Sequence, residues 1–193
     1  QKRAEKEKLQ IAYNEIILLT NMVGPNLWQM GNEIEKLALY CGERPVQSED
    51  IEALAAPNLR VTVFKLTDYL SWGKTKSAIK ILHELLEGNE NIIDIFAMIV
   101  RHFRILIQVR ACLDQDKHMN NFAIAQKIKE HAYSVKMAIE QVKNFDLKNL
   151  KTIYEKLLQI GFDSRGGKIS TTTSDHSEMQ TALEKFIVST HKF

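Results

Sequence analysis

Apolar side chains recur every three or four positions along most of the chain, which is the period of α-helices that face a core. The first clear series consists of Leu27, Met30, Ile34, Leu37 and Cys41. Gly42 follows it and is expected to end that helix, because glycine readily adopts the backbone geometry found just past a helix. Further series predict helices near residues 48–56, 59–72, 78–87, 92–113, 124–128, 135–142, 147–160 and 179–190.

The segment 92–113 is the most apolar of these predicted helices. Its apolar residues cover well over half of the helical circumference, so we expect this helix to lie at the centre of the packing. Trp28 and Trp72 each have apolar neighbours in the sequence and are expected to be core anchors.

Residues at the predicted helix starts suggest how each helix is capped. Ser48 and Asp146 each precede a helical series and are predicted N-caps. Phe145 stands just before Asp146 and is expected to pack against Leu150, as in a hydrophobic staple. Thr75 is the predicted N-cap after Gly73, which is expected to end the preceding helix.

No segment alternates apolar and polar residues between turn signals, so the sequence predicts an all-α protein with about nine helices. A boundary near residues 55–59 separates a small helical domain from a helical bundle of about 135 residues. Gly161 is expected to end the penultimate helix. Residues 165–177 then form a polar loop, in which Asp175 and Glu178 resemble a capping box for the last helix.

Composition agrees with this helical prediction and also predicts the cellular compartment of the protein. Eight glycines and three prolines in 193 residues are about half of the usual share, which favours helices over a turn-rich β fold. Cys41 and Cys112 are not spaced as a metal or redox motif, so a reduced, cytoplasmic setting is expected. No apolar run approaches the length of a membrane span, and the charged first ten residues do not resemble a signal peptide.

The net charge of +2 favours no class of partner, but the charges are distributed unevenly. Residues 101–151 hold ten basic against five acidic side chains. Arg101, Arg104 and Gln108 fall at helical spacing on one polar ridge of the most apolar helix, with Arg110 close by in the sequence. This ridge could contact phosphates or the acidic groups of a partner, or it could be the solvated edge of a buried helix.

The sequence offers no positive case for catalysis or for a bound cofactor. Gly73, Lys74 and Thr75 copy the end of a phosphate-binding loop, but Asp68 stands where its first glycine is required and a helix precedes it. The six histidines lie far apart, no carboxylate pair has an obvious acid–base setting, and no nucleophile has a recognisable base partner. We therefore name no catalytic residue, metal ligand or cofactor, and the assignment as an enzyme stays open.

Two blocks of the sequence match the pattern of a known family. The first, NLWQMGNEIEKLALY at residues 26–40, is a distinctive run between two glycines. Its signature residues are Glu33, Glu35, Lys36, Leu37 and Tyr40. The second block, IVRHFRIL at residues 99–106, contains Phe103. Together they resemble the delta subunit of the bacterial DNA polymerase III clamp loader, and looser similarity extends over residues 11–165.

This resemblance implies a division of the chain and a set of partners. Residues 1–56 would be the helical lid of an ATPase-like module, and residues 58–193 would be the collar domain that joins the pentameric loader. The family's N-terminal domain, which grips the sliding clamp, would not be part of this chain. The whole protein would open the clamp for loading onto primed DNA as an accessory subunit of a DNA-directed DNA polymerase, without an ATP site of its own.

Within the collar, the resemblance makes Arg101, Arg104, Gln108 and Arg110 candidates for contact with other loader subunits. An alternative function stays open: a helical nucleic-acid-binding or adaptor module that uses the basic stretch 101–151. A bundle enzyme with a site assembled from distant residues is a weaker third interpretation.

Overall fold

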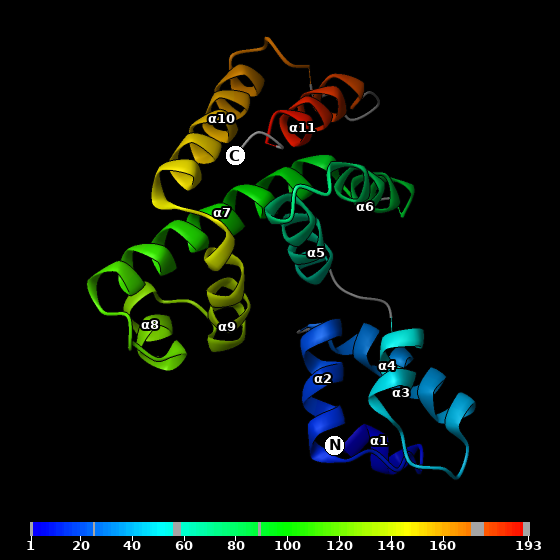
Figure 1. Cartoon of the computed structure of the whole chain (residues 1–193). Coiled ribbons are helices and arrows are strands. Elements are labelled where there is room, and N and C mark those ends of the chain that lie inside the picture. Colours follow the sequence, from blue (N-terminus) through cyan, green and yellow to red (C-terminus); the bar gives the residue numbers. More distant parts are fainter. Residues whose placement is uncertain (1, 25, 56–58, 89, 171–175, 191–193) are drawn as a thin grey trace. The chain divides into compact units, whose positions relative to one another are not determined.

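The protein is seen in a computed structural model that describes residues 2–24, 26–55, 59–88, 90–170 and 176–190. The chain divides into two compact units, Gln1–Val61 and Thr62–Phe193 (Figure 1). In the described residues all regular secondary structure is helical, which confirms the predicted all-α class.

The described residues form eleven α-helices and one short 3-10 helix, rather than about nine helices. The difference arises largely at the N-terminus, because no clear helical series precedes Leu27 in the sequence. The helices are α1 (Lys2–Lys6), α2 (Tyr13–Val23), α3 (Leu27–Cys41), α4 (Ser48–Leu54), α5 (Leu59–Ser71), α6 (Thr75–Glu87), α7 (Ile92–Gln115), α8 (Asn121–Ile128), α9 (Ala132–Gln141), η1 (Val142–Asn144), α10 (Leu147–Arg165) and α11 (Ser177–Thr190).

In the first unit, α3 packs against α1, α2 and α4. The predicted series of α3 is buried at Ile34, Leu37 and Cys41, together with Ile51 of α4. Leu27 is exposed, however, because it stands in the first turn at the edge of the buried stripe. The prediction that Trp28 is a core anchor is wrong. Trp28 is 78% exposed. At 100° per residue it lies on the side of α3 opposite to the buried residues Ile34, Leu37 and Cys41.

An ion pair closes the turn between α3 and α4. Both terminal nitrogens of Arg44 lie 2.7 Å from the two carboxylate oxygens of Asp50. Asp50 also accepts a hydrogen bond from the backbone N–H of Gln47, so Gln47 is the N-cap of α4 and the predicted N-cap Ser48 is its first residue. These hydrogen bonds, those from Arg44 first, hold the pKa of the Asp50 carboxyl well below its usual range.

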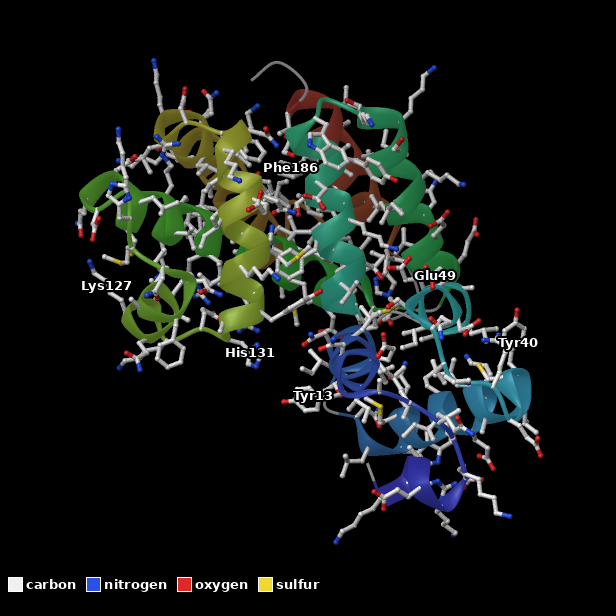
Figure 2. All side chains as sticks on the ribbon, turned by 60° about the horizontal axis from the view of Figure 1, so that its bottom comes forward. Tyr13, Tyr40, Glu49, Lys127, His131 and Phe186 are labelled. Carbon is white, nitrogen blue, oxygen red and sulfur yellow. The ribbon has the colours of Figure 1, made fainter. Side chains whose placement is uncertain are left out.

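In the second unit, α7 is the central helix, as predicted from its apolar circumference. It contacts α8, α9, α10 and α11, and Figure 1 shows it running between the α8–α9 pair at one end and α5–α6 at the other. Phe103 of α7 is fully buried and meets the rings of Phe145 and Phe186 edge to face, each at 6.2 Å between centroids. Figure 2 shows Phe186 inside the bundle, so aromatic contacts join α7 to the C-terminal helix.

The helix ends of the second unit test several predictions. Asp146 is the N-cap of α10, as predicted, and Phe145 and Leu150 are both buried. Lys74, rather than Thr75, occupies the N-cap position of α6. The predicted capping residue Asp175 lies outside the described residues, and α11 begins at Ser177.

Two further predictions in this unit are wrong. Gly161 does not end the helix, because α10 continues through it to Arg165. Trp72 is 54% exposed rather than buried, and the Lys74 ammonium lies 5.0 Å from the centre of its ring. Trp72 follows the last residue of α5, so the apolar face of that helix does not determine where the indole points.

Candidate interaction surface of the helical bundle

The predicted ridge on α7 is present, but its residues differ in their surroundings. Arg101 is already paired within the chain, since its Nη2 lies 2.7 Å from Oε2 of Glu130. Glu130 follows α8, so this ion pair fixes the end of α8 against α7. Most of the charge of Arg101 is therefore balanced before any partner binds.

Arg104 lies one turn further along α7 and is exposed, and the structure shows no hydrogen bond or ion pair from its guanidinium to any described residue. Gln108 follows on the same side and is half-buried. Of the ridge, Arg104 is thus the side chain that presents an unbalanced charge to the surroundings.

Arg110 does not belong to this ridge. It is nine residues after Arg101, which places it on the opposite side of a helix with 3.6 residues per turn. Its Nε and Nη2 each lie 3.0 Å from Oδ1 of Asp114, and its Nη1 lies 3.4 Å from the carbonyl oxygen of Phe145. Arg110 therefore connects α7 to the segment before α10.

The ridge forms one wall of a groove between α7, α10 and the start of α11. The groove has a volume of about 620 Å³. Its lining consists of Ile93, Phe96, Ala97, Val100, Arg101, Arg104, Gly161, Ser164, Arg165 and Met179. The floor is largely apolar and the polar groups are three arginines and one serine, so the sequence-predicted Arg101 and Arg104 are joined by Arg165.

Gly161 of α10 lies beside Phe96 of α7 beneath this groove. A Cβ atom at this position would lie 3.6 Å from Cζ of Phe96, in ordinary contact with that ring. A glycine inside a helix costs stability relative to alanine, and the space here admits an alanine methyl group.

Sequence reasoning missed Arg165 because it lies 61 positions after Arg104. Because the helix was predicted to end at Gly161, Arg165 was also not assigned to a helix. Arg165 is exposed, and no described residue forms an ion pair or a hydrogen bond with its side chain. Arg104 and Arg165 thus stand on the two walls of the groove, and none of the lining residues is acidic.

The basic stretch 101–151 is partly neutralised inside the unit. Besides the pairs of Arg101 and Arg110, Lys143 lies 2.6 Å from Glu140. Lys127 donates a hydrogen bond to Oε1 of Gln115 at 2.8 Å, at the outer edge of α8 (Figure 2). Fewer basic side chains of this stretch are therefore available to bind a polyanion than the sequence count suggests.

The signature residues of the first unit have different roles in the structure. Leu37 is fully buried, and buried Glu33 lies 2.6 Å from the ammonium of Lys36 one turn away. Glu35 and Tyr40 are exposed on α3. Packing explains the buried residues of this block, whereas Glu35 and Tyr40 remain accessible from solvent.

The structure also bears on metal sites and membrane spans. Over the residues that it describes, no three His, Cys, Asp or Glu side chains gather so that they could hold a metal ion. No described helix is both long enough and apolar enough to cross a membrane. Lys74, from the partial phosphate-loop match, follows helix α5 and faces the Trp72 ring.

The described residues thus form an all-helical bundle with an open groove that has arginines on its rim. Comparison with known proteins specifies its family: residues 60–187 match the C-terminal domain of the DNA polymerase III delta subunit, and the chain belongs to this family. DNA polymerase III subunit delta of Bacillus subtilis (strain 168) is 27% identical over 186 residues, which are 96% of this chain and 51% of that protein.

A solved structure supports the same assignment. The Bacillus subtilis DNA clamp loader delta protein (YqeN) matches 100% of this chain and 54% of its own, with a TM-score of 0.76 and 26% sequence identity. The chain spans about half the length of the relatives that it matches. These comparisons confirm the family that the sequence resembles. They also confirm the predicted all-helical fold.

Proposed function

We propose that this chain is the C-terminal part of a clamp-loader delta subunit and that its helical bundle holds the subunit within the assembled loader. The observation that carries this proposal is the family match over residues 60–187, which covers nearly all of the second unit. The similarity of the whole chain to a clamp loader delta protein supports it.

In this proposal the two units have different roles. Residues 1–56 form the lid of an ATPase-like module and residues 58–193 form the collar. The division of the structure at Val61 and Thr62, and a family match that begins at residue 60, support a boundary of this kind. The collar packs beside the collars of other subunits in a pentameric ring.

The activity of the whole protein depends on more than this chain. The half of the relatives that this chain does not span would contain the domain that binds the sliding clamp. The protein opens the clamp, and the assembled loader places it on primed DNA in the cytoplasm. The chain then acts as an accessory part of a DNA-directed DNA polymerase, and ATP is bound by other subunits.

Exposed lysines support nucleic-acid binding as a second candidate function. Lys129, Lys136, Lys148 and Lys151 are exposed in the basic stretch, and none of them has an ion-pair partner among the described residues. Phosphate contacts of these lysines, together with Arg101 and Arg104, would give non-specific nucleic-acid binding. In that case the bundle would be a nucleic-acid module instead of a scaffold.

The two functions respond differently to salt and to mutation. We would measure binding of the chain to DNA at two salt concentrations, and its assembly with the other loader subunits, for the wild type and for Arg101→Ala with Arg104→Ala. A scaffold predicts weak DNA binding that the double change barely alters, together with weaker assembly. Tight DNA binding that the double change abolishes, with the slope of log K against log salt reduced by about 0.7–0.9 per lost contact, would support the nucleic-acid module.

A further inference from the structure

We infer that the groove between α7 and α10 binds an amphipathic helix of a neighbouring loader subunit, with the apolar side of that helix on the groove floor and carboxylates on its flanks. This inference rests on the proposed function and adds to it the place and the chemistry of one subunit contact.

The groove is long enough for a short helix and has an apolar floor. Its floor is formed by apolar side chains of α7 and α11, and Ile93 at one end is 39% exposed although it is a large hydrophobic residue. The lining residues of α7 extend from Ile93 to Arg104, a length of roughly 16 Å at 1.5 Å per residue. An occupant of about three helical turns, with apolar residues at positions i, i+4 and i+7, matches this length.

The charges of the groove specify the flanks of the occupant. Arg104 on α7 and Arg165 on α10 have no acidic partner among the described residues, while Arg101 is balanced by Glu130. Guanidinium groups bind carboxylates through two parallel hydrogen bonds, which adds orientation to the charge attraction. A helix with Glu or Asp on both sides of its apolar stripe would place one carboxylate near each arginine.

The same lining argues against a nucleic acid as the occupant. Proteins that hold single strands combine a basic track with accessible aromatic rings on which the bases stack. In this groove the one aromatic lining residue is Phe96, which is half-buried and packs beside Gly161. A phosphate backbone would also leave the apolar floor without a matching surface, whereas the side chains of an amphipathic helix cover it.

Charge reversal on the two walls provides the first test. The full chain with Arg104→Glu and Arg165→Glu would be mixed with the other loader subunits, and assembly would be measured by sedimentation velocity. Both side chains are exposed, so the bundle should fold normally. We expect assembly to weaken at least tenfold. The matched control, Lys148→Glu with Lys151→Glu, makes the same charge change on exposed positions of α10 outside the groove and should assemble like the wild type.

A change on the groove floor tests the apolar contact separately. Ala97 is exposed and lines the groove, so Ala97→Glu places a carboxylate where the apolar stripe of the occupant would lie, without disturbing the core. We expect this variant to weaken assembly as well. Normal assembly of both Ala97→Glu and the double arginine variant would overturn the inference while leaving the scaffold function in place.

Chemical cross-linking identifies the occupant. Arg104→Lys keeps the positive charge and supplies a primary amine that a carbodiimide couples to a carboxylate in direct contact. After assembly and cross-linking, we expect mass spectrometry to find position 104 joined to Asp or Glu in a helical, apolar segment of another subunit. Assembly of this variant without such a product would contradict the inference.

Three further results would overturn it in distinguishable ways. If the wild-type chain fails to assemble with the loader subunits, the proposed function fails together with the inference. If the chain dimerises by itself and the arginine variant is monomeric, the occupant is a second copy of the chain. If a 20-nucleotide single strand binds the wild type tightly and the arginine variant does not, the occupant is a nucleic acid.

Discussion

Nε2 of His102 on α7 lies 2.5 Å from Oε1 of Gln141 on α9, inside the helical bundle. The amide nitrogen of Gln141 donates to the carbonyl oxygen of Phe64 at 3.1 Å and to Oδ1 of Asp68, both on α5. Because these contacts orient the amide, its oxygen faces the imidazole and the proton of neutral His102 belongs on Nε2. One glutamine therefore connects three helices of the second unit.

This buried imidazole predicts a loss of stability on acidification. Burial lowers the pKa of His102 to about 4, whereas an unfolded histidine titrates near 6.5. The unfolded chain therefore binds the extra proton first, and the contribution of neutral His102 is lost as the pH falls from about 6.5 towards 4. By pH 4.5 the free energy of unfolding should drop by about 2–3 kcal/mol from this group.

Urea unfolding at pH 7 and at pH 4.5, for the wild type and for His102→Gln, isolates this contribution. Asp68 acts in the opposite direction, because burial raises the pKa of its carboxyl and the folded state then binds a proton more readily. Asp68 is present in both proteins, so its effect largely cancels in the comparison. An equal loss of stability in the wild type and in His102→Gln would contradict the assigned role of His102.

The Arg44–Asp50 ion pair predicts an acid-sensitive first unit. The Arg44 hydrogen bonds lower the pKa of Asp50, so the stabilisation is present above the unfolded value near 3.8 and is lost as the pH falls below it. Asp50→Asn should lower the unfolding temperature of the first unit at pH 7, as seen by calorimetry. Glu49→Gln removes an exposed charge beside it and should change little. If Asp50→Asn has the same unfolding temperature as the wild type at pH 7, the Arg44–Asp50 pair contributes nothing to stability.

Core substitutions should distinguish the two units. Phe103→Ala should cost about 3–5 kcal/mol and Leu37→Ala about 2–5 kcal/mol, because both side chains are fully buried. Phe103 belongs to the second unit and Leu37 to the first, so each change should move a different thermal transition. A single transition that both changes shift together would mean that the units unfold cooperatively, against this expectation.

The segment Gly73–Lys74–Thr75 should not bind ATP. It connects two helices, whereas a phosphate-binding loop follows a strand and needs a further glycine where Asp68 stands. Titration of the chain with a fluorescent ATP analogue should give no micromolar binding. Micromolar binding that Lys74→Ala abolishes would contradict this prediction.

Much of the fold could be predicted because helical periodicity is a local property. The buried series of α3, α6, α7 and α10, and the Asp146 cap, follow from residues within a few positions of one another. Glycine was a less reliable signal. Gly161 is a residue typical of helix ends, but α10 continues through it to Arg165.

The candidate site could be predicted only in part, because its geometry joins distant segments. The sequence indicated Arg101 and Arg104, but it could not show that Glu130 balances the first, or that Arg165 faces the groove from another helix. The His102–Gln141 contact joins residues 39 positions apart and left no local pattern. Arg110 was grouped with the ridge by sequence proximity, although helical geometry places it on the opposite side.

Hydrogen exchange can show whether the helical bundle attaches this chain to the other loader subunits through the surface of α7 and α10. Exchange would be measured for the chain alone and in the reconstituted loader without DNA. If the bundle is attached there, assembly should slow exchange in peptides from α7 and α10 that line the groove, with little change in α8. Protection confined to the first unit, or protection of α7 and α10 that appears only when DNA is added, would contradict it.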